Sequence, residues 1–233
     1  MFDFFATPLF GIIISIFAYR IGQIFQKKTG LAFFPPVLTA YIVIISFLLI
    51  FNIPVEKYEL GGSMIDFFLA PVTIVLAVPL YKQLDLIKKN FIAVFLGILS
   101  GIVTCFISIF IFRYLFQLND TLFISLLPKS ITTPMALAVS EPNGGIKAIT
   151  AISVVITGIG GAAIGPSLYR LLHFKNRVAK GIGLGSSAHA LGTTRALEMG
   201  EVEGAFSGAS ICLTGVLTVL LLPLFLRIIG FGS

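Results

Sequence analysis

Long apolar runs alternate with short charged or polar stretches along this chain. The apolar runs cover residues 8–25, 33–51, 64–81, 91–118, 146–172 and 205–229. Each is close to or above the roughly 20 residues that an α-helix needs to cross a bilayer. Pro35 and Pro36 stand where a helix tolerates proline, whereas Pro71 predicts a kink inside the third run. The pattern predicts an all-α polytopic membrane protein, with loops at 52–63 and 82–90.

Two polar, glycine-containing segments, residues 127–145 and 185–204, interrupt the second half of this pattern. Their kernels, TTPMALAVSE and TTRALEMGE, align when one residue is dropped. Thr132 then matches Thr193, Thr133 matches Thr194, and Glu141 matches Glu201. Further on, VVITGIG (154–160) matches ICLTGVL (211–217). We therefore expect two repeats, at about 121–172 and 181–229.

The charges of the loops predict how these repeats are oriented. Lys27 and Lys28 mark the first loop as cytoplasmic, and the loops then alternate. The most basic loop, residues 170–180, obeys the positive-inside rule only if residues 121–141 enter the membrane and leave it on the same side. We expect this re-entry at Pro134 and Pro142. The second polar segment would re-enter from the cytoplasmic side.

A re-entrant piece followed by one crossing gives two copies of opposite orientation, as in many secondary transporters. The expected fold therefore has about six to eight membrane segments and two inverted repeats with broken or re-entrant helices. Residues 1–118 would form a scaffold and oligomerisation part, and residues 119–233 the transport core.

Composition agrees with a membrane protein. The chain is 57% hydrophobic and 11% charged, with a mean hydropathy of +1.05, whereas soluble domains are about a quarter charged. The net charge of +6 lies in short loops, which loop topology explains better than nucleic-acid binding. Cys105 and Cys212 lie inside apolar runs and are expected to be core residues, not a disulfide or metal site.

Lys129 and Arg195 are the sharpest candidates for chemistry, because each lies among hydroxyl side chains in one repeat. A cation in the hydrocarbon zone needs an anion or a water-filled cavity. The guanidinium fork of Arg fits a carboxylate, and Lys acts as a point charge. Alternatively, both cations pair with Glu141, Glu198 or Glu201, or extend to the membrane surface.

Further polar side chains accompany these cations. Hydroxyls near the expected helix breaks belong to Ser130, Thr132, Thr133, Ser186, Ser187, Thr193 and Thr194. Freed backbone N–H groups at such breaks favour an anion. The alternative is that each hydroxyl bonds a carbonyl of its own helix.

Four more residues have two interpretations each. His189 has a pKa range suited to carrying a proton, but a lone His is more often a packed hydrogen bonder. Glu141 and Glu201 could bind a coupling proton, or cap helices that begin at Asn143 and Gly204. Asn143 itself indicates a turn, with a ligand role second.

Enzyme motifs give no support to catalysis. The sequence contains no HExxH, CxxC or nucleophile elbow, and ITGIGGAAIG lies inside an apolar run where glycines indicate close helix packing. We expect no enzymatic activity, cofactor or metal.

Three segments carry a family resemblance: LPKSITTPMALAVSE, GGIKAITAISVVITGIGGAAIGP and GLGSSAHALGTTRALEMGEVEGAFSG. With APVTIVLAVPLY upstream, the chain resembles the LrgB/CidB/YohK family of bacterial membrane proteins. The family's usual wording is closer to SHGIGTARALE. Ala190 and Thr194 depart from it, whereas His189, Thr193, Arg195 and Glu198 remain.

The resemblance implies two competing functions in the bacterial plasma membrane. Bacterial members are named holin-like or antiholin-like proteins that modulate murein hydrolases and lysis, often beside a small LrgA/CidA-type partner. Plastid relatives exchange glycolate and glycerate, and some bacterial relatives are linked to pyruvate. Because a hole needs no matched polar breaks, we expect a monocarboxylate carrier that works by alternating access, with proton coupling, as a homo-oligomer such as a dimer.

Overall fold

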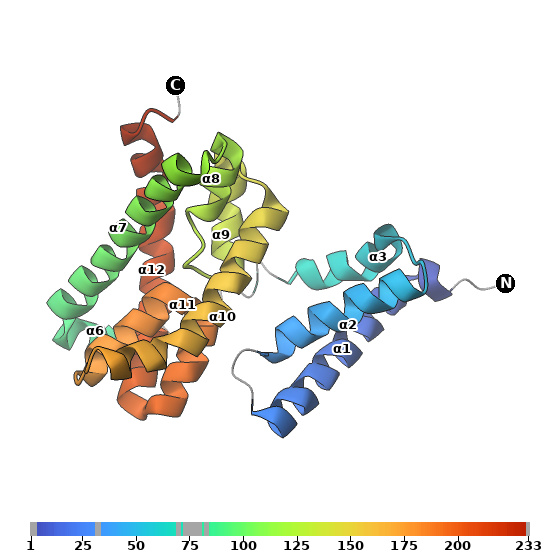
Figure 1. The fold of residues 1–233 in the computed structure, drawn as a ribbon, viewed down its shortest axis with the longest axis horizontal. Helices are drawn as coiled ribbons and strands as arrows, with labels where there is room; N and C mark the ends of the chain where they lie inside the picture. The colour runs from blue at the N-terminus through green and yellow to red at the C-terminus, as the bar shows by residue number, and fades with distance from the viewer. Residues whose placement is uncertain (1–3, 31–33, 69–70, 72–80, 82–83, 232–233) are drawn as a thin grey trace. The chain divides into compact units, whose positions relative to one another are not determined.

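A computed structural model describes residues 4–30, 34–68, 71, 81 and 84–231, and these residues form helices and turns without a β-strand (Figure 1). The chain divides into two compact units, Met1–Val72 and Thr73–Ser233. The second unit therefore includes helix α7 (Phe91–Phe116) together with both polar segments. The expected boundary at residue 118 between a scaffold part and a transport core stays a prediction.

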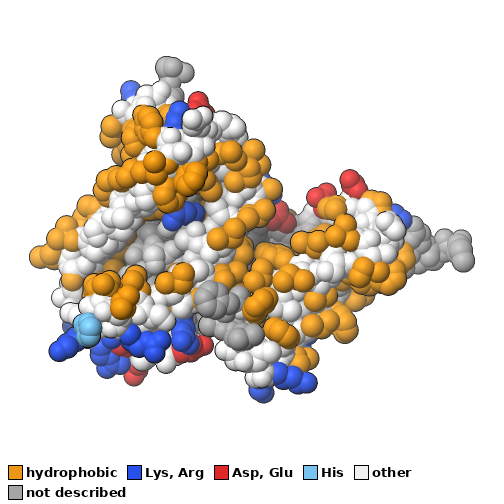
Figure 2. All heavy atoms as spheres, in the orientation of Figure 1, with side chains coloured by type: hydrophobic (Ala, Val, Ile, Leu, Met, Phe, Trp, Pro, Cys, Tyr) orange, Lys and Arg blue, Asp and Glu red, His pale blue; other side chains and the backbone are white. Residues whose placement is uncertain are grey.

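The first unit packs three helices after a short 3-10 turn, η1 (Phe4–Ala6). α1 (Pro8–Thr29) contacts both α2 (Pro36–Ile50) and α3 (Val55–Asp66). Its core is apolar, and α2 begins at the proline pair as the sequence predicted. Many hydrophobic side chains lie on the face of this unit that Figure 2 shows, and charged side chains gather at its ends.

The expectation of a loop at 52–63 is wrong, because residues 55–66 form α3. Charge suggested a loop, but Glu, Lys and Leu are also good helix formers. Gly11 and Gly61 face one another where α1 and α3 cross, and a Cβ at either would clash with backbone atoms of the other helix. The glycine pair therefore allows α3, a moderately polar helix, to pack one side closely against α1.

The expected loop at 82–90 also contains a helix, α6 (Leu84–Lys89). Asp85 lies in its first turn, and Lys88 and Lys89 lie in its last, so the charges complement the helix dipole. Most of the expected crossing at 64–81, including the kink at Pro71, depends on residues 69–70 and 72–80, which lie outside the described residues.

Among the described residues, four helices are long and apolar enough to cross a bilayer, namely α1, α7, α10 (Lys147–Leu171) and α12 (Glu201–Ile228). These are the helices expected over the apolar runs 8–25, 91–118, 146–172 and 205–229. α12 begins earlier than predicted, because Glu201 and Glu203 are well placed in a first helical turn. α2 is apolar but shorter.

The first polar segment folds back on itself. α8 (Asp120–Leu126) ends in a turn at residues 127–132, and the chain returns as α9 (Thr133–Ser140) and the 3-10 turn η2 (Glu141–Asn143). The backbone N–H of Ile146 then donates to the Ser125 hydroxyl at 2.7 Å. The reversal precedes Pro134, which is instead tolerated in the first turn of α9. We call α8, the turn and α9 the first hairpin.

The second polar segment also folds back. α11 (Arg177–Met199) is helical except at His189, whose φ of 41° and ψ of −131° break it into two arms. Arg177 at its start bonds Glu203, which lies just beyond its end, so the two ends of the segment are neighbours. We call the two arms of α11, joined at His189, the second hairpin.

The long helices of the second unit have alternating directions. Gly97 and Gly101 of α7 face Ile182 and Ser186 in rising order, so α7 runs parallel to the first arm of α11. On α10, by contrast, Gly165 and Gly161 face Leu184 and Ala188, so α10 runs antiparallel to that arm. α12 runs with α7, and α10 runs against both (Figure 1). The basic ends of α6 and α11 consequently share one end of this unit.

Candidate functional site

The reversal points of both hairpins lie beside the middles of the long helices. Cys105, near the midpoint of α7, bonds the Leu127 carbonyl and the Ser130 hydroxyl of the first hairpin, each at 3.6 Å. In the second hairpin, His189 lies against Gly158 of α10, and Ser186 against Gly101 of α7. Two polar breaks therefore meet at mid-height of the unit.

A small cavity lies between the two breaks. It has a volume of about 10 Å³ and lies next to both hairpins, α7 and α12. The lining residues are Ile102, Cys105, Phe106, Leu127, Pro128, Ser130, Ile131, Ser186, Thr214 and Thr218. Such a volume is near the lower limit for one water molecule, so the two hairpins are closed on one another. The cavity brings together Ser130 and Ser186, which the sequence predicted from different repeats.

Two buried hydroxyls near this cavity have no hydrogen-bond partner among the described residues. Thr214 lines the cavity and is 1% exposed, and its Oγ1 is unpaired. Thr132, the N-cap residue of α9, is buried with its Oγ1 likewise unpaired. Leaving a buried hydroxyl unsatisfied costs about 1–3 kcal/mol. Both positions therefore have hydrogen-bonding capacity that the fold does not use.

The two predicted cations lie in different surroundings. Lys129 lies in the reversal of the first hairpin, next to Ser130, and is half-buried without a side-chain partner among the described residues. Arg195 lies on the returning arm of the second hairpin and pairs with Glu198, one of the alternatives expected for it. Its Nε is nevertheless buried and unpaired within the described part of the chain. No described hydrogen bond or ion pair joins the two cations.

His189 is a buried residue at a strained position. Its side chain is 6% exposed and its Nε2 lies 2.9 Å from the Val154 carbonyl of α10. A positive φ is unusual for a residue with a Cβ. The bond to Val154 anchors the tip of the second hairpin to α10, which is the packed role expected as an alternative to proton carrying.

The remaining predicted hydroxyls and Asn143 make local contacts. Thr193 bonds Ser207 of α12 at 2.6 Å, and thereby ties the returning arm to that helix. Ser187 and Thr194 are exposed and bond carbonyls of their own helix, and Thr133 is half-buried at the start of α9. Asn143 donates to the Val139 carbonyl at 2.7 Å, as a turn residue does.

Glu141 and Glu201 lie away from the reversal points. Each follows directly on the returning arm of its hairpin, and each is exposed. Helices begin at Lys147 and Glu201, so the expected caps for helices starting at Asn143 and Gly204 are wrong. The two matched acids thus occupy corresponding places at the bases of the hairpins.

The sequence reasoning missed an ion pair that closes the second hairpin. Arg177 Nε donates to both carboxylate oxygens of Glu203, at 3.0 and 3.1 Å. Glu203 is only 4% exposed, whereas the Arg177 side chain is about half exposed. The hydrogen bond to Glu203, helped by the charge of that carboxylate, raises the pKa of Arg177 above its ordinary value. The pair joins the first arm of the hairpin to α12.

Cys105 and Thr214 were also missed as site residues. Cys105 was expected in the core, and both cysteines are indeed free, with Cys212 buried. A signal for Thr214 existed, because the repeat match of VVITGIG with ICLTGVL aligns it with Thr157. A hydroxyl that recurs at one place in both repeats is a stronger candidate than a single one.

Close backbone packing holds the second hairpin against α12. A Cβ at Gly185 would clash with the Ser207 carbonyl, whereas one at Gly208 would meet nothing within 4 Å. We expect Gly185→Ala to destabilise the protein by about 1–3 kcal/mol through overpacking, seen as a lower midpoint of thermal unfolding in detergent. Gly208→Ala, at the residue next to Ser207 in α12, is the control and should leave the midpoint unchanged or slightly raised.

Comparisons with known proteins give the chain a family. The family model described as the LrgB-like family matches residues 15–228. The chain is 39% identical to "Antiholin-like protein LrgB" of Bacillus mycoides (strain KBAB4), over 96% of this chain and 98% of the relative. It is 40% identical, with the same coverage, to the protein of that name in Bacillus cereus (strain B4264). No solved structure matches the chain.

Proposed function

The chain belongs to the LrgB-like family, and we propose that it is a multi-pass membrane carrier for small carboxylates. In this proposal a 2-hydroxy or 2-oxo monocarboxylate such as glycolate, glycerate or pyruvate binds between the two hairpins. It is released to either side by alternating access. The observation that carries the proposal is the meeting of both polar reversals beside the middles of α7, α10 and α12.

The lengths of the elements support binding near the middle of a bilayer. The first arm of α11, residues 177–188, is about 18 Å long at 1.5 Å per residue. Half of a hydrocarbon core of about 30 Å is about 15 Å, so an arm of this length reaches the midplane. Each hairpin is followed by one long helix, and these helices, α10 and α12, are antiparallel. This is the expected relation of two inverted repeats.

The chemistry of the reversals supports an anionic substrate. Lys129 supplies a positive charge, and the unpaired Thr214 and Thr132 hydroxyls supply hydrogen bonds. The N-terminus of α9 adds backbone N–H groups whose dipoles favour negative charge. A carboxylate that also carries a hydroxyl or keto oxygen can use all of these groups. We assign the second contact to Arg195, through its unpaired Nε.

Proton coupling is part of the same proposal. His189 lies at the reversal of the second hairpin, and Glu141 and Glu201 lie at the two hairpin bases. The Val154 carbonyl accepts a hydrogen bond from the His189 imidazole, so protonation of His189 would strengthen this anchor and loss of the proton would loosen it, which would couple a proton to movement of the second hairpin. We place the protein in the bacterial plasma membrane as a homo-oligomer such as a dimer.

Uptake into proteoliposomes tests the proposal. Labelled glycolate, glycerate or pyruvate should enter with saturable kinetics and compete with one another, and an inward proton gradient should accelerate entry. Arg195→Ala should remove saturable uptake while the thermal unfolding midpoint stays near that of the parent protein. Non-saturating entry of unrelated solutes as well would contradict a carrier.

The names of the relatives favour a second candidate function. Proteins 39–40% identical over nearly the full length are called antiholin-like, so a regulator of murein hydrolases and lysis acting with an LrgA/CidA-type partner is the alternative. A regulator of that kind needs no substrate site between the hairpins. Substitutions at the cavity should then leave lysis phenotypes unchanged, whereas in the carrier proposal they should change lysis and uptake together.

Thr214→Val separates stability from transport. Valine keeps the shape of threonine and removes an unpaired hydroxyl, so we expect unchanged or higher thermal stability. Uptake should fall by about three- to tenfold, because a substrate hydrogen bond of about 0.5–1.5 kcal/mol is lost. Thr150→Val is the matched control: its hydroxyl bonds Ser140 at 2.8 Å, so this variant should lose stability instead. Unchanged uptake in Thr214→Val would remove Thr214 from the site.

A further inference from the structure

A second cavity lies at the opposite end of the second hairpin from its tip. It has a volume of about 400 Å³ and is bounded by the end of α10, the connection to α11 and the end of the returning arm. Its lining residues are Pro166, Tyr169, Arg170, His173, Phe174, Lys175, Lys180 and Met199. None of these is among the residues of the carrier site.

The geometry of this cavity is fixed by contacts between α10 and α11. The Tyr169 hydroxyl donates to the Lys180 carbonyl at 3.1 Å, and the Tyr169 and Phe174 rings lie 5.7 Å apart. His173 has a φ of 53°, which turns the chain so that the Phe174 N–H donates to the Tyr169 carbonyl at 2.9 Å. The basic side chains are therefore held around one space rather than spread along a loose loop.

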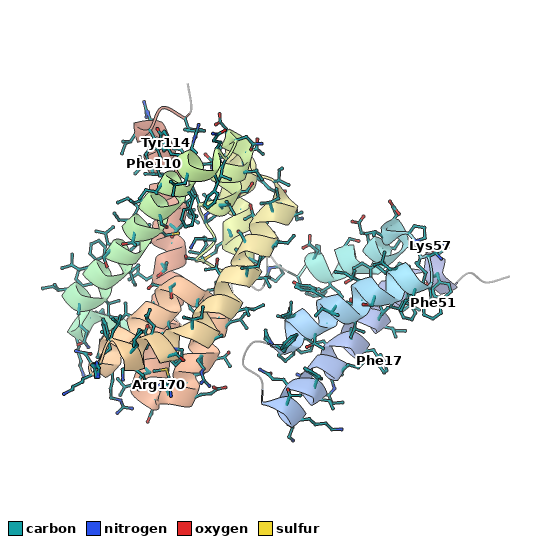
Figure 3. The ribbon with its side chains drawn as sticks, in the orientation of Figure 1. Phe17, Phe51, Lys57, Phe110, Tyr114 and Arg170 are labelled. Atoms are coloured by element: carbon teal, nitrogen blue, oxygen red, sulfur yellow. The ribbon has the colours of Figure 1, made fainter. Side chains whose placement is uncertain are left out.

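The charge of the cavity is positive. Arg170, Lys175 and Lys180 line it, and residues 170–180 contain no acid. Glu203 is the nearby acid that interacts with Lys180, but it is buried and already paired with Arg177. Arg170 lies at the end of α10, near the start of α11 (Figure 3), and Figure 2 shows basic side chains gathered along this edge of the second unit. Glu198 and Glu201 flank Met199 and are exposed, but Glu198 pairs with Arg195, so basic side chains outnumber the acids here and an anion would meet a net positive field.

Apolar side chains adjoin the basic ones. Leu168, Leu171 and Leu172 are exposed at the end of α10, and Phe174 is exposed at the cavity itself. In a membrane helix these side chains lie where acyl chains meet headgroups, since α10 is long enough to cross and ends here. A ligand that satisfies both surfaces has an anionic head and an apolar tail.

We propose that this cavity binds the phosphodiester headgroup of an anionic phospholipid. The basic side chains of Arg170, Lys175 and Lys180 hold the phosphate, and the leucines of α10 contact the acyl chains. Because Lys180 lies on the first arm of α11 and Met199 on the returning arm, a bound lipid contacts both arms of the second hairpin. The proposal does not depend on what passes between the hairpins.

Lipid binding to the purified full-length chain tests this proposal. Delipidated protein in detergent is titrated with phosphatidylglycerol or with phosphatidylcholine of the same acyl chains, and bound lipid is counted by native mass spectrometry. We expect phosphatidylglycerol to saturate at one molecule per chain with at least about tenfold higher affinity than phosphatidylcholine. Equal affinity for the two lipids would overturn the proposal.

A pair of matched variants localises the site. Arg170→Gln/Lys175→Gln/Lys180→Gln should weaken phosphatidylglycerol binding by about 100-fold, at about fivefold for each basic residue. Arg20→Gln/Lys27→Gln/Lys28→Gln removes the same charge from α1 and should retain the parent affinity. Lys175→Gln alone, at an exposed loop position, should weaken binding about fivefold. This single variant keeps the test valid if the triple variant misfolds. Equal losses in both triple variants would overturn the site.

Soluble anions distinguish the source of the phosphate. Inorganic phosphate and the water-soluble headgroup glycerophosphoglycerol are added as competitors at the lipid concentration. We expect neither to displace bound phosphatidylglycerol measurably, because each lacks the apolar contacts at Leu168, Leu171 and Leu172. Full displacement by inorganic phosphate would overturn the lipid and identify a site for a free phosphate.

Discussion

Replacing Lys129 by methionine should lower saturable carboxylate uptake by about ten- to 100-fold. Methionine keeps an unbranched chain of similar length but removes the positive charge from the reversal of the first hairpin. A hydrogen bond to a charged group contributes about 1.5–3 kcal/mol, which corresponds to roughly this range of affinity. The measurement is the initial rate of labelled glycolate uptake into proteoliposomes as its concentration is varied.

Folding should not suffer from this change, because Lys129 has no ion-pair partner among the described residues and a half-buried cation is costly to keep. Lys28→Met, at the exposed end of α1, is the control and should transport at the parent rate. Lys129→Arg restores the charge with a larger fork and should recover part of the activity. Parent-like uptake in Lys129→Met would show that the substrate does not meet this charge.

Arg177→Gln should lower the midpoint of thermal unfolding more than Glu203→Gln does. Removing the arginine leaves the buried Glu203 carboxylate without its bidentate partner, and a buried unpaired charge is strongly destabilising. Removing the carboxylate instead leaves an arginine that already reaches solvent. We expect a drop of at least about 5 °C for Arg177→Gln in detergent-purified protein.

The asymmetry between the two variants is the informative result. A surface ion pair contributes little whichever partner is removed, so equal small effects would mean that Glu203 is solvated in the working protein. Arg20→Gln is a suitable control, because Arg20 is exposed and its hydrogen bond within the described part of the chain is to Gln23 of its own helix. It should leave the unfolding midpoint unchanged. A larger effect in Glu203→Gln than in Arg177→Gln would contradict the burial argument.

Length and hydropathy were sufficient to predict the long helices, because a run of 20 or more apolar residues has few other stable forms in lipid. Loop charge favoured a first polar segment that returns to its starting side, and the bond from Ile146 to Ser125 closes that segment on itself. The polar residues of α3 led to the wrong prediction of a loop. This helix packs on α1 through a close glycine contact, which the polar pattern does not indicate.

The details of the candidate site required three-dimensional information. The second hairpin turns at His189 through one unusual φ, in a stretch where the small residues on either side gave no indication of which residue would break the helix. Arg177 and Glu203 are 26 positions apart, and the basic loop offered several other partners. The repeat match marked Thr214 as a recurring hydroxyl, but its place at the cavity depends on α12 passing both reversals, which only the structure shows.

Counterflow distinguishes a single site between the hairpins that is exposed to each side in turn from a continuous pore. Proteoliposomes are preloaded with unlabelled glycolate or with buffer, and the entry of labelled glycolate into the two preparations is compared. A carrier predicts faster entry and a transient accumulation of label above the outside concentration, both lost in Lys129→Met. An entry rate that does not change with the internal glycolate would contradict alternating access and favour the antiholin-like function.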